Sequence, residues 1–356
     1  MKRPVLTGLA SLCPCGPGME LLWQFLASGS SAIRGLTRFS SVSGALGSEI
    51  TGIDLDDIID NRSFRRAADV SKYALATIQL ALRDAGLDSA AGEESVMVTA
   101  VTHGAMNYTQ AYHESMVKRG VEDISPILFS DSVLNAPAGN ASICYGIQGS
   151  VHTIVAGTAA SIKAAMMGCR LIHEDGINRA VIVSVEELNE LSFHCRIKFG
   201  ESAMSEGAGV FLIEDGSIIK GKQVYCQISG YASHIDPAGP YVSFQKAVGK
   251  ALSMAGIEKH HLDFALVDMP PGMHTRHLDG IPSDTVSRYT GNAFCVSSAW
   301  NILLAAYMIY KGTLPGPFMK RWEEKTKLNT IQNVIVCNLE ETGSAAALVL
   351  SKQEHV

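Results

Sequence analysis

Residues 70–101, VSKYALATIQLALRDAGLDSAAGEESVMVTAV, share a pattern with residues 244–269, FQKAVGKALSMAGIEKHHLDFALVDM. In each stretch, apolar and small residues recur every three to four positions, which predicts a helix with one buried face. The two helices are expected to end at Gly86 and Gly256, because glycine commonly ends a helix. A polar stretch and a near-continuous apolar strand then follow in both. The chain therefore carries an internal duplication.

The correspondence continues further along the chain. A helix predicted over residues 158–172 precedes the strand AVIVSVE, and a helix predicted over residues 299–310 precedes the strand NVIVCNL. Strands that are apolar on both faces and alternate with helices predict buried sheets covered by helices. We expect an α/β protein in which two β/α halves form two sheets with helices between them. The expected halves are residues 1–215 and 216–356, with the junction after the strand GVFLIE.

The composition and net charge indicate which classes of protein and which binding partners can be excluded. The chain has 356 residues, of which 47% are hydrophobic and 18% charged, and this balance excludes a disordered protein. The net charge of −6 gives no general attraction to nucleic acid or to an anionic membrane. The start, MKRPVLTGLASLC, predicts a first strand and turn, and Lys163 interrupts the small-residue run 153–169, so we expect no membrane span and a cytoplasmic location.

The cysteines and histidines form no metal-ligand pattern. The eight cysteines are scattered, mostly within apolar runs, and indicate buried thiols of a reduced protein. Cys13 and Cys15 are too close in sequence for a redox CxxC pair, and no second pair completes a zinc site. We therefore expect neither a metal nor a cofactor. His113, His274 and His277 fit surface or loop positions.

Several segments, taken in order, resemble the ketosynthases of the thiolase fold. The opening PVLTGLASLCPCGPGMELLWQFLASGSSAIRGLTRF is similar to that family's first strand, turn and helix. ISPILFSDSVLNAPAGNASICYGIQGS resembles the stretch that leads to the nucleophile, and SEGAGVFLIEDG resembles the strand that closes the first half. The resemblance covers nearly the whole chain. It implies a thiolase-like fold with a layered α-β-α-β-α body.

The same resemblance implies that the catalytic positions are altered. The nucleophile turn reads Gly157-Thr158-Ala159-Ala160-Ser161, so Ala159 stands where these enzymes carry cysteine, and an offset of one residue places Thr158 there. Asp268-Met269-Pro270-Pro271-Gly272-Met273 stands at the first histidine loop, and Asn301 stands at the second histidine. The gating loop reads Asn338-Leu339-Glu340-Glu341-Thr342-Gly343-Ser344. Four altered elements indicate that condensation chemistry is lost, because a thioester needs a thiol.

Ketosynthase-like chains without the cysteine resemble chain length factors of type II polyketide and aryl-polyene systems. The resemblance implies a heterodimer with a cysteine-bearing ketosynthase and access to an acyl carrier protein through that complex. Such folds pair through the strand before the nucleophile helix, here HTIVAG, which makes Asn135, Ile154 and Val155 candidate interface residues. The chain departs from the commonest pattern, which has glutamine at the cysteine position.

The segment after AVTHG predicts a helix with a stripe of large side chains. Tyr108, Tyr112 and Met116 recur every four residues, and a capping-box-like start at Asn107 and Gln110 and an end at Gly120 are expected. Ordinary packing explains such a stripe equally well. The resemblance implies a second role, closure of an acyl tunnel and control of product length.

Two alternatives remain beside the chain length factor. One is an atypical acyltransferase or hydrolase of the thiolase fold that uses Thr158, Ser161 or another residue in place of cysteine. The other is a free-standing acyl-binding or assembly protein. A cysteine-bearing ketosynthase encoded beside this chain would favour the first reading over the last.

Overall fold

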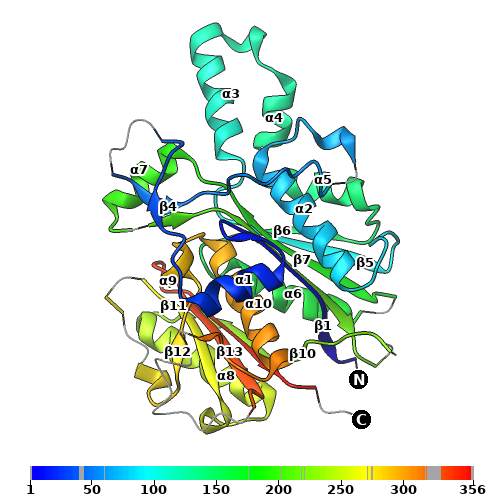
Figure 1. The fold of residues 1–356 in the computed structure, drawn as a ribbon, viewed down its shortest axis with the longest axis vertical. Helices are drawn as coiled ribbons and strands as arrows, with labels where there is room; N and C mark the ends of the chain where they lie inside the picture. Colours follow the sequence, from blue (N-terminus) through cyan, green and yellow to red (C-terminus); the bar gives the residue numbers. More distant parts are fainter. Residues whose placement is uncertain are drawn as a thin grey trace.

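The computed structural model describes residues 2–39, 44–59, 61–174, 176–201, 203–217, 219, 221–270, 272–273, 276–316, 318 and 330–353. Its architecture is α/β, with helices on both sides of and within a large folded sheet (Figure 1). Within the described residues, the first-half strands are β1 Pro4–Cys13, β2 Gly16–Pro17, β3 Arg34–Gly35, β4 Leu46–Ser48, β5 Ser95–Val101, β6 Val151–Val155, β7 Arg179–Glu186, β8 Met204–Ser205 and β9 Gly207–Asp215. The second-half strands are β10 Cys226–His234, β11 Phe264–Asp268, β12 Ser283–Asp284, β13 Asn333–Leu339 and β14 Ala345–Ser351.

The α-helices divide between the same two halves. Those before Asp215 are α1 Met19–Ser28, α2 Asp69–Asp84, α3 Met106–Arg119, α4 Pro126–Ser132, α5 Ala136–Tyr145, α6 Ala160–Ile172 and α7 Glu190–Lys198. Those after it are α8 Pro240–Ala255, α9 Ser287–Thr290 and α10 Cys295–Lys311. Short 3-10 turns cover η1 Arg62–Phe64, η2 Val121–Asp123, η3 Lys259–His261 and η4 Arg276–Leu278.

The strand order repeats itself. The main sheet runs β12-β11-β13-β14-β10-β1-β9-β7-β5-β6, so each half follows the same path outward from the centre. In both halves two antiparallel pairings are followed by two parallel ones. The antiparallel pairing of β1 with β10 joins the halves into one hydrogen-bonded sheet, where the sequence predicted two. The division at residue 215 stays a prediction, although β9 ends there.

Five layers follow from the burial pattern. One core cluster contains α6 and α10 together with strands of both halves, so these helices lie between the two parts of the sheet. A second cluster packs α2 and α5 on the outer face of the first half, and a third packs α8 on the outer face of the second. The α-β-α-β-α body predicted from the sequence is confirmed. Helix α10 begins at Cys295, about one turn earlier than expected.

Two glycines show the duplication at atomic detail. The register shifts between Leu6 and Gly8 in the β1–β9 pair, and between Ile228 and Gly230 in the β10–β14 pair. A Cβ on Gly8 would lie 2.6 Å from the carbonyl oxygen of Ala81 in α2. A Cβ on Gly230 would lie 2.1 Å from the carbonyl oxygen of Ala251 in α8. In each half, the glycine at the bulge therefore allows the covering helix to pack closely against the strand. Gly8 and Gly230 occupy equivalent places in the two halves.

Helices α3 and α4 project from the body as a hairpin (Figure 1). The capping box predicted at Asn107 and Gln110 is wrong, because α3 already begins at Met106 with Ala105 before it. Both side chains instead accept hydrogen bonds from the amide of Asn189, at 2.8 and 3.1 Å. The predicted helix end at Gly120 is confirmed.

The cysteines differ in one respect from the expectation of free thiols. Cys13 and Cys15, at the end of β1, form a disulfide with Cα atoms 5.3 Å apart. Cys195 is exposed and Cys144 is half-buried, whereas Cys169, Cys226, Cys295 and Cys337 are buried free cysteines. Among the described residues, no helix is both long and apolar enough to cross a membrane.

The glycine bulges generate a stability prediction. Gly230→Ala should lower the free energy of unfolding by about 1–3 kcal/mol or more, because the added methyl group overlaps helix backbone that cannot move aside alone. Gly249→Ala is the matched control, since Gly249 lies exposed on α8 with open space around its Cβ position. That change should stabilise the helix by about 1 kcal/mol. Guanidinium unfolding measures both, and a Gly230→Ala chain with unchanged stability would contradict the close approach.

Candidate functional site

One cavity of about 780 Å³ lies where the carboxyl ends of buried strands meet the starts of α6 and α10. Ligand sites in α/β proteins often occupy such an edge, because loops there join strands to helices. Side chains from both halves line it. Those at the ends of strands or just after them include Thr102, His103, Asp268, Leu339 and Glu340, and those before helices include Gly157, Thr158 and Phe294.

The start of α6 holds a carboxylate of the protein itself. Ala159 is the N-cap residue and is fully buried, and its methyl side chain cannot form a thioester. Its backbone N–H donates to Oε1 of Glu340 at 3.1 Å, and Nζ of Lys163 lies 3.1 Å from Oε2. A negative charge at a helix N-terminus is stabilised by the free N–H groups there. The Glu340 carboxylate therefore already accepts the backbone N–H of Ala159, which an oxyanion formed at this turn would need as a hydrogen-bond donor.

Thr158, the other candidate at this turn, is also engaged. Its hydroxyl donates to Oδ1 of Asn338 at 2.9 Å, and its carbonyl accepts a hydrogen bond from the hydroxyl of Ser298. Ser161 is fully buried and donates to the carbonyl of Cys295 at 2.5 Å. Neither hydroxyl is paired with a histidine in the described residues, so neither has the base that activates an alcohol nucleophile.

Asn301 lies on α10 one turn after Ser298 and is fully buried. Its amide nitrogen donates to Oδ2 of Asp268 at 2.7 Å, and its oxygen accepts from the backbone N–H of Val286 at 3.0 Å. The hydroxyl of Thr285 donates to the other oxygen of Asp268 at 2.6 Å. Burial raises the pKa of Asp268 above its usual range. Asn301 thus holds a carboxyl group in place, and it has no titratable atom for acid–base chemistry.

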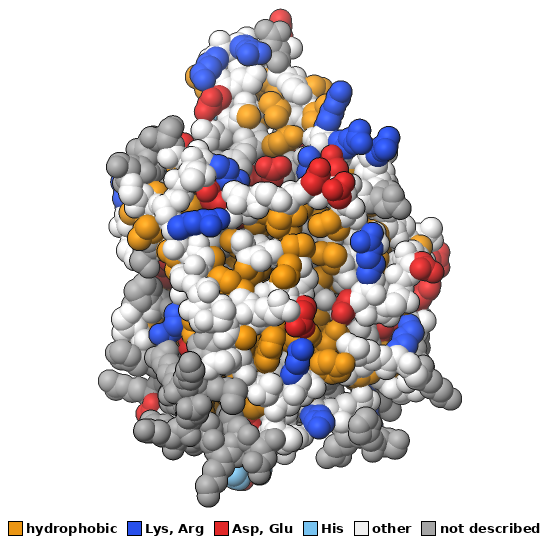
Figure 2. Space-filling model, in the orientation of Figure 1, with side chains coloured by type: hydrophobic (Ala, Val, Ile, Leu, Met, Phe, Trp, Pro, Cys, Tyr) orange, Lys and Arg blue, Asp and Glu red, His pale blue; other side chains and the backbone are white. Residues whose placement is uncertain are grey.

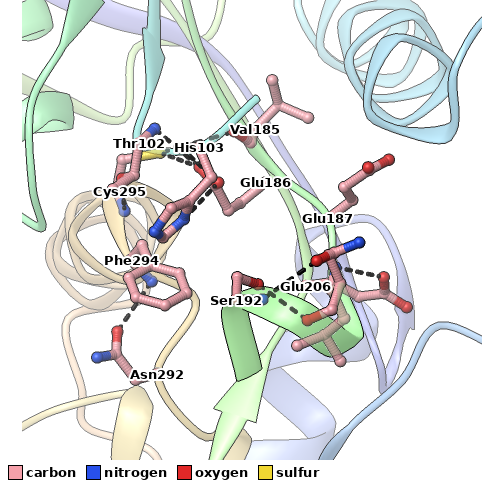
Figure 3. Close-up of polar contacts among 12 residues, drawn as sticks. Thr102, His103, Val185, Glu186, Glu187, Ser192, Glu206, Asn292, Phe294 and Cys295 are labelled. Atoms are coloured by element: carbon pink, nitrogen blue, oxygen red, sulfur yellow. Dashed lines mark hydrogen bonds and ion pairs between the residues drawn. The ribbon is translucent and has the colours of Figure 1, made fainter. Parts of the chain in front are cut away.

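A second polar group lies at the ends of β5 and β7 (Figure 3). The Glu186 carboxylate accepts backbone N–H bonds from Thr102 at 2.8 Å and His103 at 2.7 Å, and Nδ1 of His103 lies 3.0 Å from it. The thiol of Cys295 lies 3.6 Å from the same carboxylate. Burial first, and then Glu186, raises the pKa of Cys295 well above its usual value. This cysteine starts a helix, yet its environment keeps it protonated and unreactive.

Carboxylates outnumber cations around the cavity. Arg196 pairs with Glu201 at 2.8 Å and with Glu341 at 3.3 Å, and Arg288 pairs with Asp284 at 2.7 Å. Asp268 contacts neutral groups. The cavity therefore presents more negative than positive charge to a ligand. Within the described residues, no cluster of histidine, cysteine and acidic side chains could hold a metal ion.

The sequence-predicted tunnel residues do not line this cavity. Tyr108 donates from its hydroxyl to the carbonyl of Arg66 at 2.8 Å, and the ring of Tyr112 lies 5.7 Å from that of Phe129 in α4. Met116 is half-buried on the same helix. These side chains belong to the projecting hairpin, so a tunnel role requires a second chain and stays a prediction.

The predicted interface residues lie at an edge of the sheet. β6 is the last strand of the path, and no described strand pairs with its outer side. Val155 is 52% exposed, and Ile154 is half-buried against the central core. Asn135 is the exposed residue before α5. Their part in an interface stays a prediction.

Sequence reasoning missed His103, Glu186 and the contact of Glu340 with Ala159. His103 and Glu186 lie just after and at the end of neighbouring parallel strands, which is the signal that could have found them. Cys169, interpreted from the sequence as a core residue, is fully buried, and burial raises the pKa of its thiol. His277 is half-buried near Phe244, and His274 lies outside the described residues.

Glu187, next to Glu186, links the hairpin to the body. Its carboxylate accepts from the backbone N–H of Asn107 at 2.7 Å and of Val70 at 3.3 Å, near the starts of α3 and α2. Burial raises the pKa of Glu187 from 4.5 to about 8, the backbone hydrogen bonds oppose this, and Asp69 and Glu206 add to it. The group therefore ionises far less readily in the folded chain than in the unfolded chain.

Comparison with known proteins places this geometry among ketosynthases. Residues 1–208 match the family model described as "Beta-ketoacyl synthase, N-terminal domain". The chain is 22% identical to 3-oxoacyl-[acyl-carrier-protein] synthase 2 of Synechocystis sp. over 88% of this chain and 82% of that one. It is 27% identical to a putative mitochondrial 3-oxoacyl-[acyl-carrier-protein] synthase of Schizosaccharomyces pombe, over 74% and 72%.

Solved structures share the whole fold. The ishigamide ketosynthase/chain length factor matches with a TM-score of 0.85 at 19% identity, covering 99% of this chain and 100% of that one. A beta-ketoacyl synthase from Burkholderia phymatum matches with a TM-score of 0.84 at 16% identity and the same coverage. These likenesses confirm the thiolase-like fold expected from the sequence.

The raised pKa of Glu187 generates a prediction about pH. Between pH 4.5 and 8 the folded chain keeps this proton and the unfolded chain loses it, so the group's contribution to stability is lost as pH rises to about 8. A glutamine at this position cannot ionise, so the Glu187→Gln variant does not lose stability in this way as pH rises. The free energy of unfolding of the variant, relative to that of the parent, should therefore increase from pH 5 to pH 9. Urea unfolding at both values measures it, with the exposed Glu93→Gln as control. A pH-independent difference would contradict the raised pKa.

Proposed function

The chain belongs to the beta-ketoacyl synthase family, and from this membership we propose that it is a chain length factor. It pairs with a cysteine-bearing ketosynthase of a type II polyketide system, of the aromatic or aryl-polyene kind, and shapes the acyl tunnel of the pair. It does not condense acyl chains itself. An acyl carrier protein reaches the tunnel through the complex.

The observation that carries the proposal is the state of the α6 N-terminus. Ala159 offers no thiol, and Glu340 accepts the backbone N–H that a tetrahedral oxyanion would use. An oxyanion hole works only when its donors are free and aimed at the reacting oxygen. A carboxylate placed there repels a second negative charge. Nucleophile and electrostatic stabilisation are therefore missing together.

The charge of the cavity supports the same conclusion. Glu201, Glu341 and Asp284 are paired with arginines and Glu340 with Lys163, and Asp268 adds a further carboxyl group to the wall. A malonyl substrate brings a carboxylate of its own, which like charges at short range disfavour. Neither His103 nor another described histidine stands on α10, where the decarboxylating histidine of an active ketosynthase is expected from the resemblance.

The surface around β6 supports pairing with a second chain. Large apolar side chains that are at least one third exposed recur between residues 117 and 155, on α3, η2, α4, the link between α4 and α5, α5 and β6. They are Val117, Val121, Ile127, Phe129, Val133, Leu134, Ile143, Val151 and Val155. Apolar side chains are visible on the projecting hairpin in Figure 2. An open strand edge beside exposed apolar residues is the type of surface that obligate interfaces bury.

Similar proteins agree with this choice of partners. The solved structure with a TM-score of 0.85 is titled a ketosynthase/chain length factor. Another, with a TM-score of 0.78 at 18% identity, is titled a type II PKS acyl-carrier protein in complex with its ketosynthase. The curated relatives carry the name of active synthases. The substitutions at Ala159 and Asn301 are what favours the non-condensing role for this chain.

The proposal predicts that the full chain is silent in condensation. Incubated with acyl-carrier and malonyl-carrier thioesters, it should give no condensation product and no acyl-enzyme in the mass spectrum. A cysteine-bearing ketosynthase is the positive control. Ala159→Cys alone should stay silent, because Glu340 still holds the backbone donor. A condensation product from the parent chain would overturn the proposal.

Pairing is tested at the strand edge. Val155→Glu should abolish co-purification with a co-expressed cysteine-bearing ketosynthase, because a charge would be buried in an apolar interface. Met254→Glu is the matched control, since Met254 is 53% exposed on α8 and Val155 is 52% exposed on β6. Size-exclusion chromatography of the co-expressed pair is the measurement. A parent chain that remains monomeric beside that ketosynthase would contradict the proposal.

The hairpin is tested through product length. Tyr112→Ala in the reconstituted pair should shift products to longer chains, because a smaller side chain opens space that close packing otherwise denies. Tyr108→Ala and Met116→Ala are expected to act in the same direction, and more weakly. Product profiling by mass spectrometry is the readout. An unchanged length distribution from an intact, active pair would mean that α3 only packs against α4.

A further inference from the structure

His103 is held in the orientation of a proton acceptor. Its Nδ1 lies 3.0 Å from Oε1 of Glu186, which is fully buried and already accepts two backbone N–H groups. A carboxylate that only accepts hydrogen bonds requires the ring proton to be on Nδ1. The lone pair of a neutral imidazole then lies on Nε2. Histidine and carboxylate have the same arrangement in a hydrolytic triad, where the carboxylate orients the histidine as a base.

Nε2 of His103 is available to a ligand. The side chain is 26% exposed and lines the cavity of about 780 Å³. No residue in the described ranges forms a hydrogen bond with Nε2. The ring of Phe294 packs against the imidazole with centroids 4.4 Å apart and fixes it between the ring and Glu186 (Figure 3).

The backbone of Phe294 is strained. Its φ is 52°, and it is the only non-glycine residue with positive φ in the described part of the chain. Such a conformation costs roughly 1–3 kcal/mol and occurs preferentially at functional sites. The side-chain oxygen of Asn292 accepts the backbone N–H of Phe294 at 2.8 Å and keeps the residue in this conformation.

A cation lies against the same phenyl ring. The guanidinium carbon of Arg196 is 5.4 Å from the centroid of Phe294, and Arg196 also lines the cavity. Its side chain is 22% exposed and pairs with Glu201 at 2.8 Å and with Glu341 at 3.3 Å. A base with a free lone pair and a partly exposed cation therefore share one wall. That is the pair of groups needed to deprotonate water and stabilise a developing oxyanion.

We propose that His103 is a catalytic general base that hydrolyses acyl thioesters bound in this cavity. Nε2 takes a proton from water, and the water oxygen forms a bond to the carbonyl carbon. Arg196 stabilises the oxyanion. The carbon–sulfur bond then breaks, and the proton passes from His103 to the leaving thiolate. The products are a carboxylic acid and a thiol, and no acyl-enzyme forms. Glu186 is a positioning residue.

The cavity also selects the class of substrate. Its excess of carboxyl groups disfavours an anionic acyl group, and Val267, Phe294 and Leu339 give it apolar wall. Its volume is in the range that binds molecules of drug-like size. The substrate class is therefore a neutral acyl chain of several carbons. This activity goes beyond the proposed pairing role and does not depend on the condensation site at Ala159.

The test uses the full chain and hexanoyl-N-acetylcysteamine, a neutral thioester probe, with release of free thiol as the readout. The parent chain should hydrolyse it faster than buffer, and His103→Ala should lower the enzymatic rate at least about 100-fold. Added imidazole should restore part of the His103→Ala activity, which a merely structural role would not allow. His260→Ala is the control, because His260 is exposed on η3, and it should match the parent.

His103→Asn keeps an amide donor toward Glu186 and guards against a folding defect in the alanine variant. It should fold as the parent does, by thermal denaturation, and remain inactive. A parent rate equal to buffer, a His103→Ala rate equal to the parent, or an acyl adduct on Cys295 would overturn the proposal. None of these results bears on pairing or on the absence of condensation, which have their own assays.

Discussion

The enclosure of α6 and α10 between the two halves of one sheet is the constraint on which the rest of the structure depends. Both helices must approach strands closely, so small residues stand at the contacts. A Cβ on Gly168 of α6 would lie 2.6 Å from Ile182, and a Cβ on Gly209 of β9 would lie 2.8 Å from Ala299 of α10. Interiors packed at crystal density cannot absorb such overlaps. The β1–β10 pairing then joins the two halves across these helices.

This enclosure also places the chemistry. The helices start at the same edge of the molecule where β5, β7, β11 and β13 end, so helix N-termini and strand-end side chains meet at one cavity. An N-terminus in that position favours a negative charge, and in this chain Glu340 supplies it. The same edge carries His103 on its Glu186 support. The Glu340 carboxylate thus fills the start of α6, while the His103 side chain remains accessible from the cavity.

The projecting hairpin and the β6 edge have a different character. Helix α3 has no fully buried residue, and its large side chains contact α4 and the loop at Arg66 rather than the cavity. A helix that leaves apolar side chains half-exposed gains little from its own chain, which is consistent with a second chain covering it. The carboxylate of Glu187 ties the start of this hairpin to the body, so its position depends on a buried group whose pKa is raised.

The sequence by itself determined the duplication, the layered α/β body and the absence of a thiol at Ala159. The duplication follows from local periodicity, and the layered body and the missing thiol follow from the resemblance of the chain to ketosynthases, so none of them needs coordinates. Ala81 and Ala251 occupy equal places in the repeat, but only the structure showed that they face the bulges at Gly8 and Gly230.

Only the tertiary structure decided that the two sheets join, that Glu340 reaches Ala159 across 181 residues, and that Glu186 orients His103 across 83. The physical reason is that hydrogen bonds between distant segments depend on how strands align in space. Residue spacing carries no record of that alignment.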